Sequence, residues 1–305
     1  MDGDVQVPLP VTIDEFVDRF REIYGHIDGS RSEEALWLQV VEESSSIAEA
    51  VREIRYEQIL SHAANFFAWL CGFMAKCNKE LTSICHLSED FSEVIWLKYP
   101  HICPRCSSNP CECLKRWREL NAREEEQKKQ AYKSIEDRAR HTRTSRVRNL
   151  DDLEAMFEEI HGNNIMVTDI KEIAFHFLEE VGEVSEQIRE LRALSEKASR
   201  NSQRISETKR ELRKELADVF SWLIALLIKV DYLAMNSTPA IDALASIRGV
   251  KGIREPLTAS PRIRLLRRLI LKYYSKNDKM VCRTCHEEKC NLSLHERLYP
   301  VAQQR

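Results

Sequence analysis

An internal repeat is the feature that most constrains the fold, because a repeated sequence predicts a repeated structural unit. The segment VVEESSSIAEAVREIR (40–55) aligns without a gap with FLEEVGEVSEQIRELR (177–192), at an offset of 137 positions (179 − 42). Further along each copy, NFFAWLCGF (65–73) aligns with DVFSWLIAL (218–226). We therefore expect two similar modules in one chain, referred to below as the first copy and the second copy.

Hydrophobic spacing indicates that both copies are helical. In the second copy, apolar residues recur at intervals of three and four from Ile170 to Leu191, and again from Leu212 to Val230. The whole chain of 305 residues has only 8 glycines and 9 prolines, which favours long helices over an all-β fold rich in turns. We predict an all-α protein made of two tandem helical bundles.

Composition divides the chain into five segments. We predict a helical module at 1–99, a cysteine-rich clip at 100–114, a charged helical linker at 115–149, a second helical module at 150–276, and a second clip with the tail at 277–305. The linker carries many arginines, which could form a solvated face or contact nucleic acid; we favour the solvated face. Before its clip, each copy has an apolar helix and a Lys-Tyr pair, Lys98-Tyr99 and Lys272-Tyr273.

Charge and hydropathy favour a cytoplasmic protein without a membrane partner. The formal net charge is −3, so no global basic field draws the chain to nucleic acid or to a membrane. The first ten residues, MDGDVQVPLP, lack the basic and apolar regions of a signal peptide. The longest apolar run, VFSWLIALLI (219–228), is far shorter than the ~18 residues of a membrane-spanning helix.

Four carboxylates of the second copy lie on or beside the apolar stripes of its two long helices. Glu180 and Glu183 belong to one helix, and Glu215 and Asp218 belong to the next. Antiparallel packing of these helices would bring both acidic pairs together, where like charges raise one another's pKa values. A hard divalent cation such as Mg²⁺ or Mn²⁺ would neutralise such a group of oxygen ligands.

The alternative is that these acids form a solvated edge of two surface helices. In the first copy, three of the four acidic positions have been lost; the residues that match Glu183, Glu215 and Asp218 are Ser46, His62 and Asn65. Independent surface positions would be expected to change one by one. The joint loss favours a single functional unit.

The motif Glu179-Glu180-x-x-Glu183, followed by Glu215-x-x-Asp218, resembles the signature of the MazG-like all-α nucleoside triphosphate pyrophosphohydrolases. The strings LEEVGEVSE and KELADVFSWL are similar to those of the family word by word. The resemblance covers residues 150–231, with 12–78 as a degenerate copy. The gap between the two motifs is longer than the commonest one in the family.

This resemblance implies a reaction and a site. Mg²⁺ would be held at Glu180, Glu183, Glu215 and Asp218, with Glu179 assisting catalysis. A nucleoside triphosphate (ribo or deoxy) would be hydrolysed to the monophosphate and pyrophosphate. Trp222 would line the substrate pocket, with a core position as its alternative. Family members work as dimers, so the two copies would form a pseudo-dimer that assembles into a homo-oligomer. The rival function is a non-catalytic nucleotide sensor or a nucleic-acid-associated adaptor.

Seven of the ten cysteines fall in two clusters with the spacing of metal ligands. The first cluster, Cys103, Cys106, Cys111 and Cys113, supplies four thiolates, which suits a closed structural Zn²⁺ site. The second cluster has three cysteines, and a histidine is expected to complete it; its ligands would be Cys282, Cys285, Cys290 and His295, with His286 as the alternative fourth ligand. We predict a small zinc clip after each helical module.

Overall fold

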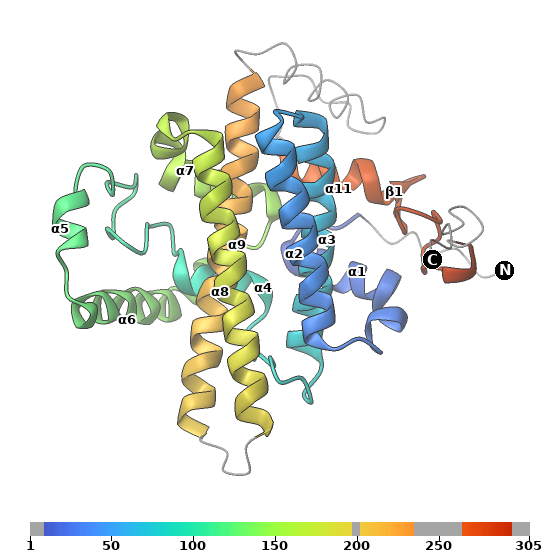
Figure 1. Ribbon diagram of the computed structural model, residues 1–305, viewed down its shortest axis with the longest axis horizontal. Helices are drawn as coiled ribbons and strands as arrows, with labels where there is room; N and C mark the ends of the chain where they lie inside the picture. The colour runs from blue at the N-terminus through green and yellow to red at the C-terminus, as the bar shows by residue number, and fades with distance from the viewer. Residues whose placement is uncertain (1–8, 197–201, 235–263, 295–305) are drawn as a thin grey trace.

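The computed structural model describes residues 9–196, 202–234 and 264–294 (Figure 1). This part of the chain is mostly helical, with one two-stranded hairpin, so the expectation of an all-α fold is confirmed. In chain order the elements are α1 (Ile13–Asp28), α2 (Glu33–Arg52), α3 (Tyr56–Lys79), α4 (Phe91–Lys98), α5 (Trp117–Asn121), α6 (Glu125–His141), the 3-10 helix η1 (Arg143–Ser145), α7 (Leu150–Val167), α8 (Ile170–Glu196), α9 (Ser202–Ala234), α11 (Leu265–Tyr274), β1 (Ser275–Lys276) and β2 (Lys279–Met280).

Four long helices, α2, α3, α8 and α9, form the centre of the molecule (Figure 1). Helix α2 packs on α3, α8 packs on α9, and the two pairs meet where α2 lies against α8. The rings of Phe66 and Phe177 are 4.8 Å apart across this junction, and Trp37 Nε1 donates a hydrogen bond of 2.8 Å to Ser185 Oγ. The two copies therefore share one continuous apolar core.

Polar side chains form the N-caps of several helices, at the points where the sequence changes from a loop to an apolar stripe. Thr12 caps α1 in a capping box with Glu15, and Ser32 caps α2. Asp90 and Asn149 do the same for α4 and α7. Each cap satisfies backbone N–H groups that would otherwise lack partners at the helix start. These local signals fix where the helices begin, and the apolar stripes fix which faces they bury.

The sequence repeat appears in the structure as repeated contacts. Helix α1 packs on α3 in the first copy, as α7 packs on α9 in the second. Cys111 N donates to the carbonyl of Ile160 at 2.7 Å, and Cys290 N donates to the carbonyl of Ile23 at 2.9 Å. Ile23 and Ile160 are 137 positions apart, which is the offset of the sequence repeat. Each cysteine cluster is therefore attached to the first helix of the opposite copy.

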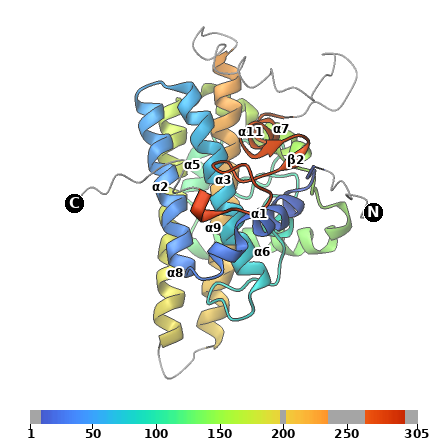
Figure 2. The same cartoon turned by 90° about the vertical axis from the view of Figure 1, so that its right-hand side faces the viewer.

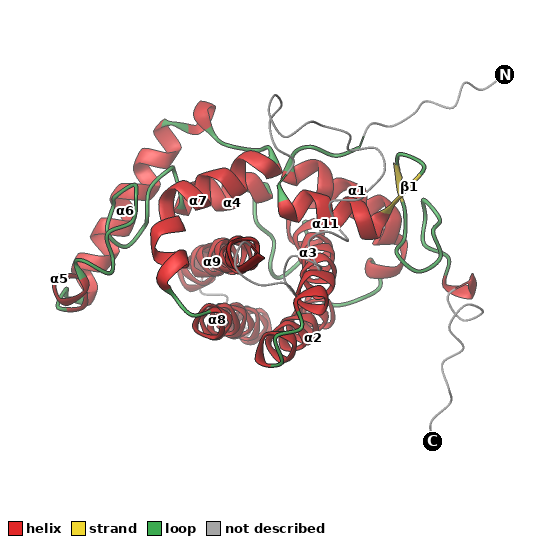
Figure 3. Ribbon diagram, turned by 90° about the horizontal axis from the view of Figure 1, so that it is seen from above, coloured by secondary structure: helices red, strands yellow, loops and turns green. Residues whose placement is uncertain are grey.

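The two copies also exchange their last helices. Helix α4 ends the first copy but packs on α9 of the second. Helix α11 ends the second copy and packs on α3 of the first, and Figure 2 shows these two helices next to one another. Viewed along the long helices, α7, α4, α11 and α1 lie along one side of the bundle (Figure 3). The long helices of each copy are therefore covered in part by the last helix of the other copy.

This exchange corrects the sequence alignment at the last helix. The Tyr99 hydroxyl donates a hydrogen bond to Asp218, and the Tyr274 hydroxyl donates one to Asn65, which is the residue that matches Asp218. Tyr99 thus corresponds to Tyr274. The expected match of Lys98-Tyr99 with Lys272-Tyr273 is wrong by one position, and the residue that corresponds to Lys98 is Tyr273.

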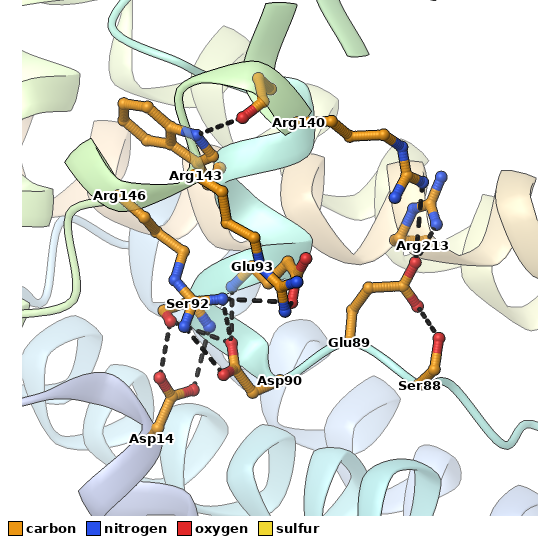
Figure 4. A network of polar contacts seen from close by, with 12 residues as sticks. Asp14, Ser88, Glu89, Asp90, Ser92, Glu93, Arg140, Arg143, Arg146 and Arg213 are labelled. Carbon is orange, nitrogen blue, oxygen red and sulfur yellow. Dashed lines mark hydrogen bonds and ion pairs between the residues drawn. The ribbon is translucent and has the colours of Figure 1, made fainter. Parts of the chain in front are cut away.

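The linker is not simply a solvated face, because several of its arginines bind the acidic start of α4 (Figure 4). Arg146 is buried and contacts both carboxylate oxygens of Asp90, at 2.9 and 3.0 Å, and Glu93 at 3.2 Å. Arg143 also binds Glu93, at 2.7 Å. On the other side of this network, Arg213 of α9 contacts Glu136 of α6 at 2.6 Å. The linker therefore fastens α4 to the bundle.

Among residues 9–196, 202–234 and 264–294, no helix is both long enough and apolar enough to cross a bilayer.

A fragment of residues 150–305 should not behave as a stable monomer. It would expose the apolar faces that α2, α3 and α4 cover, and each large apolar side chain would lose about 1.5–3 kcal/mol of burial. Sedimentation velocity should show aggregates or a homodimer, and co-expression with residues 1–149 should restore a complex of one copy each. A monodisperse, stable monomer would contradict the shared core.

Candidate metal centre

The antiparallel packing of α8 and α9 brings three carboxylates to one place. Ligand oxygens of Glu180, Glu215 and Asp218 all lie within 4.8 Å of one another, and we call these residues the acidic cluster. Each residue is half-buried beside a buried apolar stripe, formed by residues such as Phe177 on α8 and Leu216 on α9. The sequence expectation that both helices contribute acids to one region is therefore met for these three residues.

The remaining two acidic candidates lie at the border of this cluster. Glu183 is exposed, yet it is close enough to Glu215 to raise the pKa of that residue. Glu179 is also exposed, and its carboxylate lies 3.2 Å from His176 Nδ1. Both residues are thus exposed to solvent, outside the group of three carboxylates.

Two residues from the first copy complete the site. The Lys98 ammonium contacts Asp218 Oδ2 and lies 3.9 Å from Glu215 Oε2, and the Tyr99 hydroxyl donates to Asp218 Oδ1 at 2.6 Å. Both residues stand at the end of α4, which the exchange of helices places on α9. Sequence reasoning noted this Lys-Tyr pair only as part of the repeat. The feature of the sequence that could have pointed to this pair is its position just before the first cysteine cluster.

The acidic cluster is short of positive charge. Burial, followed by the neighbouring Asp218, raises the pKa of Glu180 to about 9, although Lys98 partly offsets this. Burial also raises the pKa of Glu215 to about 7. Burial disfavours the charged form of Lys98, but Asp218 and Glu215 outweigh it and raise the pKa of the ammonium. The lysine is thus held charged, and its single charge does not satisfy the surrounding carboxylates.

Trp222 lies at the edge of the acidic cluster, where the resemblance placed it. Its Nε1 donates a hydrogen bond of 3.3 Å to Glu180 Oε1, and its ring is stacked on His176 with centroids 4.8 Å apart. The indole is only partly buried, so it is not a closed core residue. Trp222 and His176 therefore form a stacked aromatic pair next to the carboxylates.

The corresponding place in the first copy holds a network of hydrogen-bonded polar side chains. Glu43, which matches Glu180, contacts His62 Nδ1 at 2.8 Å and accepts a hydrogen bond of 3.1 Å from Asn65. Asn65 is also bound by Arg283, which follows the first cysteine of the second cluster. These groups satisfy one another, so the first copy has no comparable shortage of positive charge.

The first cysteine cluster brings four thiols together, as expected. Ligand sulfurs of Cys103, Cys106, Cys111 and Cys113 lie within 4.8 Å of one another, a set that could hold a metal such as zinc. Backbone N–H groups point at the sulfurs, with Glu112 N donating to Cys106 Sγ at 3.3 Å. Such donors stabilise thiolates, and four thiolates fill a tetrahedral site completely.

The second cysteine cluster repeats the first with one ligand fewer. Ligand sulfurs of Cys282, Cys285 and Cys290 lie within 4.8 Å of one another and could likewise hold a metal such as zinc. The position that matches Cys113 is Leu292, which cannot bind a metal. The preferred fourth ligand, His295, lies outside the described residues. The alternative, His286, is exposed and does not join the three sulfurs.

Comparisons with protein families, with curated proteins and with solved structures find no match for this chain. The chemistry of the acidic cluster and of the two cysteine clusters therefore carries the functional argument.

Replacing Glu180 with glutamine should stabilise the protein in Mg²⁺-free buffer. The folded protein binds a proton at Glu180 up to about pH 9, whereas the unfolded chain releases it near 4.5, so this contribution to stability is lost as the pH rises between these values. At pH 8–9 we expect Glu180→Gln to melt about 2–4 °C higher than the wild type, the shift that roughly 1 kcal/mol gives in a chain of this size, and the gap should close toward pH 5. The control is Glu186→Gln, an exposed position on the same helix. An equal gap at both pH values would contradict this account.

The purified protein should carry two zinc ions per chain by elemental analysis. Cys106→Ser and Cys285→Ser should each remove one ion and lower the melting temperature, because structural zinc binding contributes folding free energy. Cys71→Ala is the matched control, since Cys71 is buried but belongs to neither cluster. Native protein without zinc would exclude the two clips.

Proposed function

We propose that this chain is a tandem MazG-like protein whose second copy hydrolyses a nucleoside triphosphate to the monophosphate and pyrophosphate, with Mg²⁺ or Mn²⁺ as cofactor. The observation that supports the proposal is the convergence of Glu180, Glu215 and Asp218 from two antiparallel helices, at the place where the family resemblance puts its metal ligands. The raised pKa values of Glu180 and Glu215, caused first by burial and then by neighbouring charges, are consistent with a site that binds a cation.

The donor set fits a hard divalent ion. All ligands offered are carboxylate oxygens, the type that Mg²⁺ and Mn²⁺ prefer. The three grouped carboxylic acids, with Glu183 at the border, lie around the ammonium of Lys98, so a bound divalent ion would allow those that are protonated to ionise. A bound divalent ion would polarise the phosphate oxygens and lower the pKa of the attacking water. Glu180, Glu215 and Asp218 would hold it.

The side chains around the cluster have separate roles in this proposal. Lys98 and Tyr99 fix the orientation of Asp218, while the Trp222 indole N–H fixes one oxygen of Glu180. Trp222 and His176 are stacked on one another beside the cluster, and a nucleotide base would stack on the outer face of this pair. Glu179 lies at the solvent side within reach of His176, where it can accept a proton from an attacking water.

The first copy serves as a scaffold in this proposal. It lacks the carboxylates at His62 and Asn65, but it supplies α4 and covers α8, so that the two copies form a pseudo-dimer within one chain. The two cysteine clusters would bind zinc as structural clips that hold the exchanged ends in place. Such intrachain pseudo-dimers could assemble further into a homo-oligomer.

A second function is favoured by one specific contact. Because the Lys98 ammonium already binds Asp218, the cluster could be a nucleotide sensor that binds its ligand without hydrolysis. Such a sensor would bind a nucleotide in calorimetry but release no pyrophosphate.

A panel of ribo- and deoxynucleoside triphosphates, assayed with Mg²⁺, tests the catalytic proposal. We expect release of pyrophosphate and not of orthophosphate, and at least about 100-fold loss of activity in Glu180→Gln and Glu215→Gln, because each removes a metal ligand. The matched control is Glu43→Gln, the same change at the corresponding position of the first copy, which should stay within a few-fold of wild type. Full activity in Glu215→Gln would exclude this site.

A further inference from the structure

The end of α4 places a buried cation inside the acidic cluster. Lys98 is only 8% exposed, and its ammonium contacts Asp218, lies 3.9 Å from Glu215 Oε2 and donates a hydrogen bond of 3.2 Å to the carbonyl of Lys214. An ammonium has three protons to donate. Two acceptors on α9, Asp218 and the Lys214 carbonyl, lie within hydrogen-bond distance of the ammonium, and the side chain is buried, so the lysine is a fixed part of the cluster and not a mobile surface side chain.

The ammonium lies close to two carboxylates that could also be ligands of a metal ion. In sites with two metal ions, the ions lie about 3.5–4 Å apart and share carboxylates that bridge them. The Lys98 ammonium lies between Asp218 and Glu215, which are two of the three carboxylates in the acidic cluster. The third carboxylate, Glu180, lies on the facing helix, and it would bind a divalent cation together with Glu215.

The first copy gives independent support, because both members of the Lys98–Asp218 pair are replaced there, and the amide that stands in place of the acid is bound by Arg283. The corrected alignment places Tyr273 opposite Lys98, and Asn65 opposite Asp218. In the first copy, the amide Asn65 replaces the carboxylate of Asp218, and Tyr273 replaces Lys98. A lysine that only filled space beside α9 would have no reason to change together with this acid. The pairing therefore assigns Lys98 to the acidic set.

We propose that the Lys98 ammonium is a resident cation of the acidic cluster, which takes the place of one divalent ion and limits the cluster to one metal fewer than its carboxylates would otherwise bind. The inference rests on the proposed function for the identity of the site as a divalent-metal centre. It adds that the metal content of the second copy is set by a residue of the first. The exchanged helix α4 is thus a component of the metal site.

Counting bound Mn²⁺ tests this directly in the zinc-loaded, full-length protein. Mn²⁺ prefers oxygen ligands and leaves the cysteine clusters occupied by zinc. Equilibrium titration followed by electron paramagnetic resonance should show that Lys98→Met binds one more Mn²⁺ per chain than the wild type. The additional ion should give the dipolar coupling of a close Mn²⁺ pair, which the wild type lacks.

Two control variants separate charge from packing. Lys98→Arg keeps the positive charge and should keep the wild-type count. Lys229→Met removes a different buried lysine, which lies on α9 and donates to the carbonyls of Ile165 and Met166. This variant should also keep the wild-type count. If Lys98→Met fails to fold, Lys98→Gln is the second neutral variant, and the wild-type spectrum is a test that needs no variant.

The outcomes are distinct from those of the activity assay. An unchanged Mn²⁺ count in the neutral variants, or a coupled Mn²⁺ pair in the wild type, would overturn the role of Lys98 even if pyrophosphate is released. An additional Mn²⁺ in Lys98→Met would support it even if no nucleotide is hydrolysed, in which case only the proposed function fails.

Discussion

The exchange of last helices between the two copies is the constraint on which the rest of the structure depends. Because α4 packs on α9, and α11 packs on α3, each copy is completed by a segment that the other copy encodes. The contact of α2 with α8 joins the two bundles at one face, and the exchanged helices add a second set of contacts between them. It also explains why a copy that has lost most of its acids is retained, since α4 still carries Lys98 and Tyr99 to the acidic cluster.

In both copies, a carboxylate lies in a partly buried position between two helices, where its charge needs a partner. In the first copy, Glu43 is satisfied by His62 and Asn65, so no further cation is needed. In the second copy, the matching residue Glu180 faces further carboxylates, and its pKa rises. Charge that is left unsatisfied in a folded protein reduces stability, and its persistence in only one copy is what a binding site would require.

Much of this arrangement could be predicted from the sequence, because helix period and repeat offset are local properties. Those signals gave the long helices and the convergence of Glu180, Glu215 and Asp218. The sequence could not give the exchange of α4 and α11, because packing between distant segments leaves no periodic trace. For that reason the sequence alone pairs Lys98 with Lys272 instead of Tyr273, and it predicts a solvated face for Arg146, which is buried against Asp90.

The exchange also links the first cysteine cluster to the acidic cluster. Tyr99, which donates to Asp218, packs its ring on Phe157 and His161 of α7, at 5.0 and 5.9 Å, and Cys103 follows it by four residues. The same cluster is tied to α7 through the hydrogen bond from Cys111 to Ile160. Metal bound there would restrain both the chain after α4 and the helix against which Tyr99 packs. The clip would therefore act on the position of Lys98 and Tyr99, and so on the geometry of Asp218, without touching a ligand of the acidic cluster.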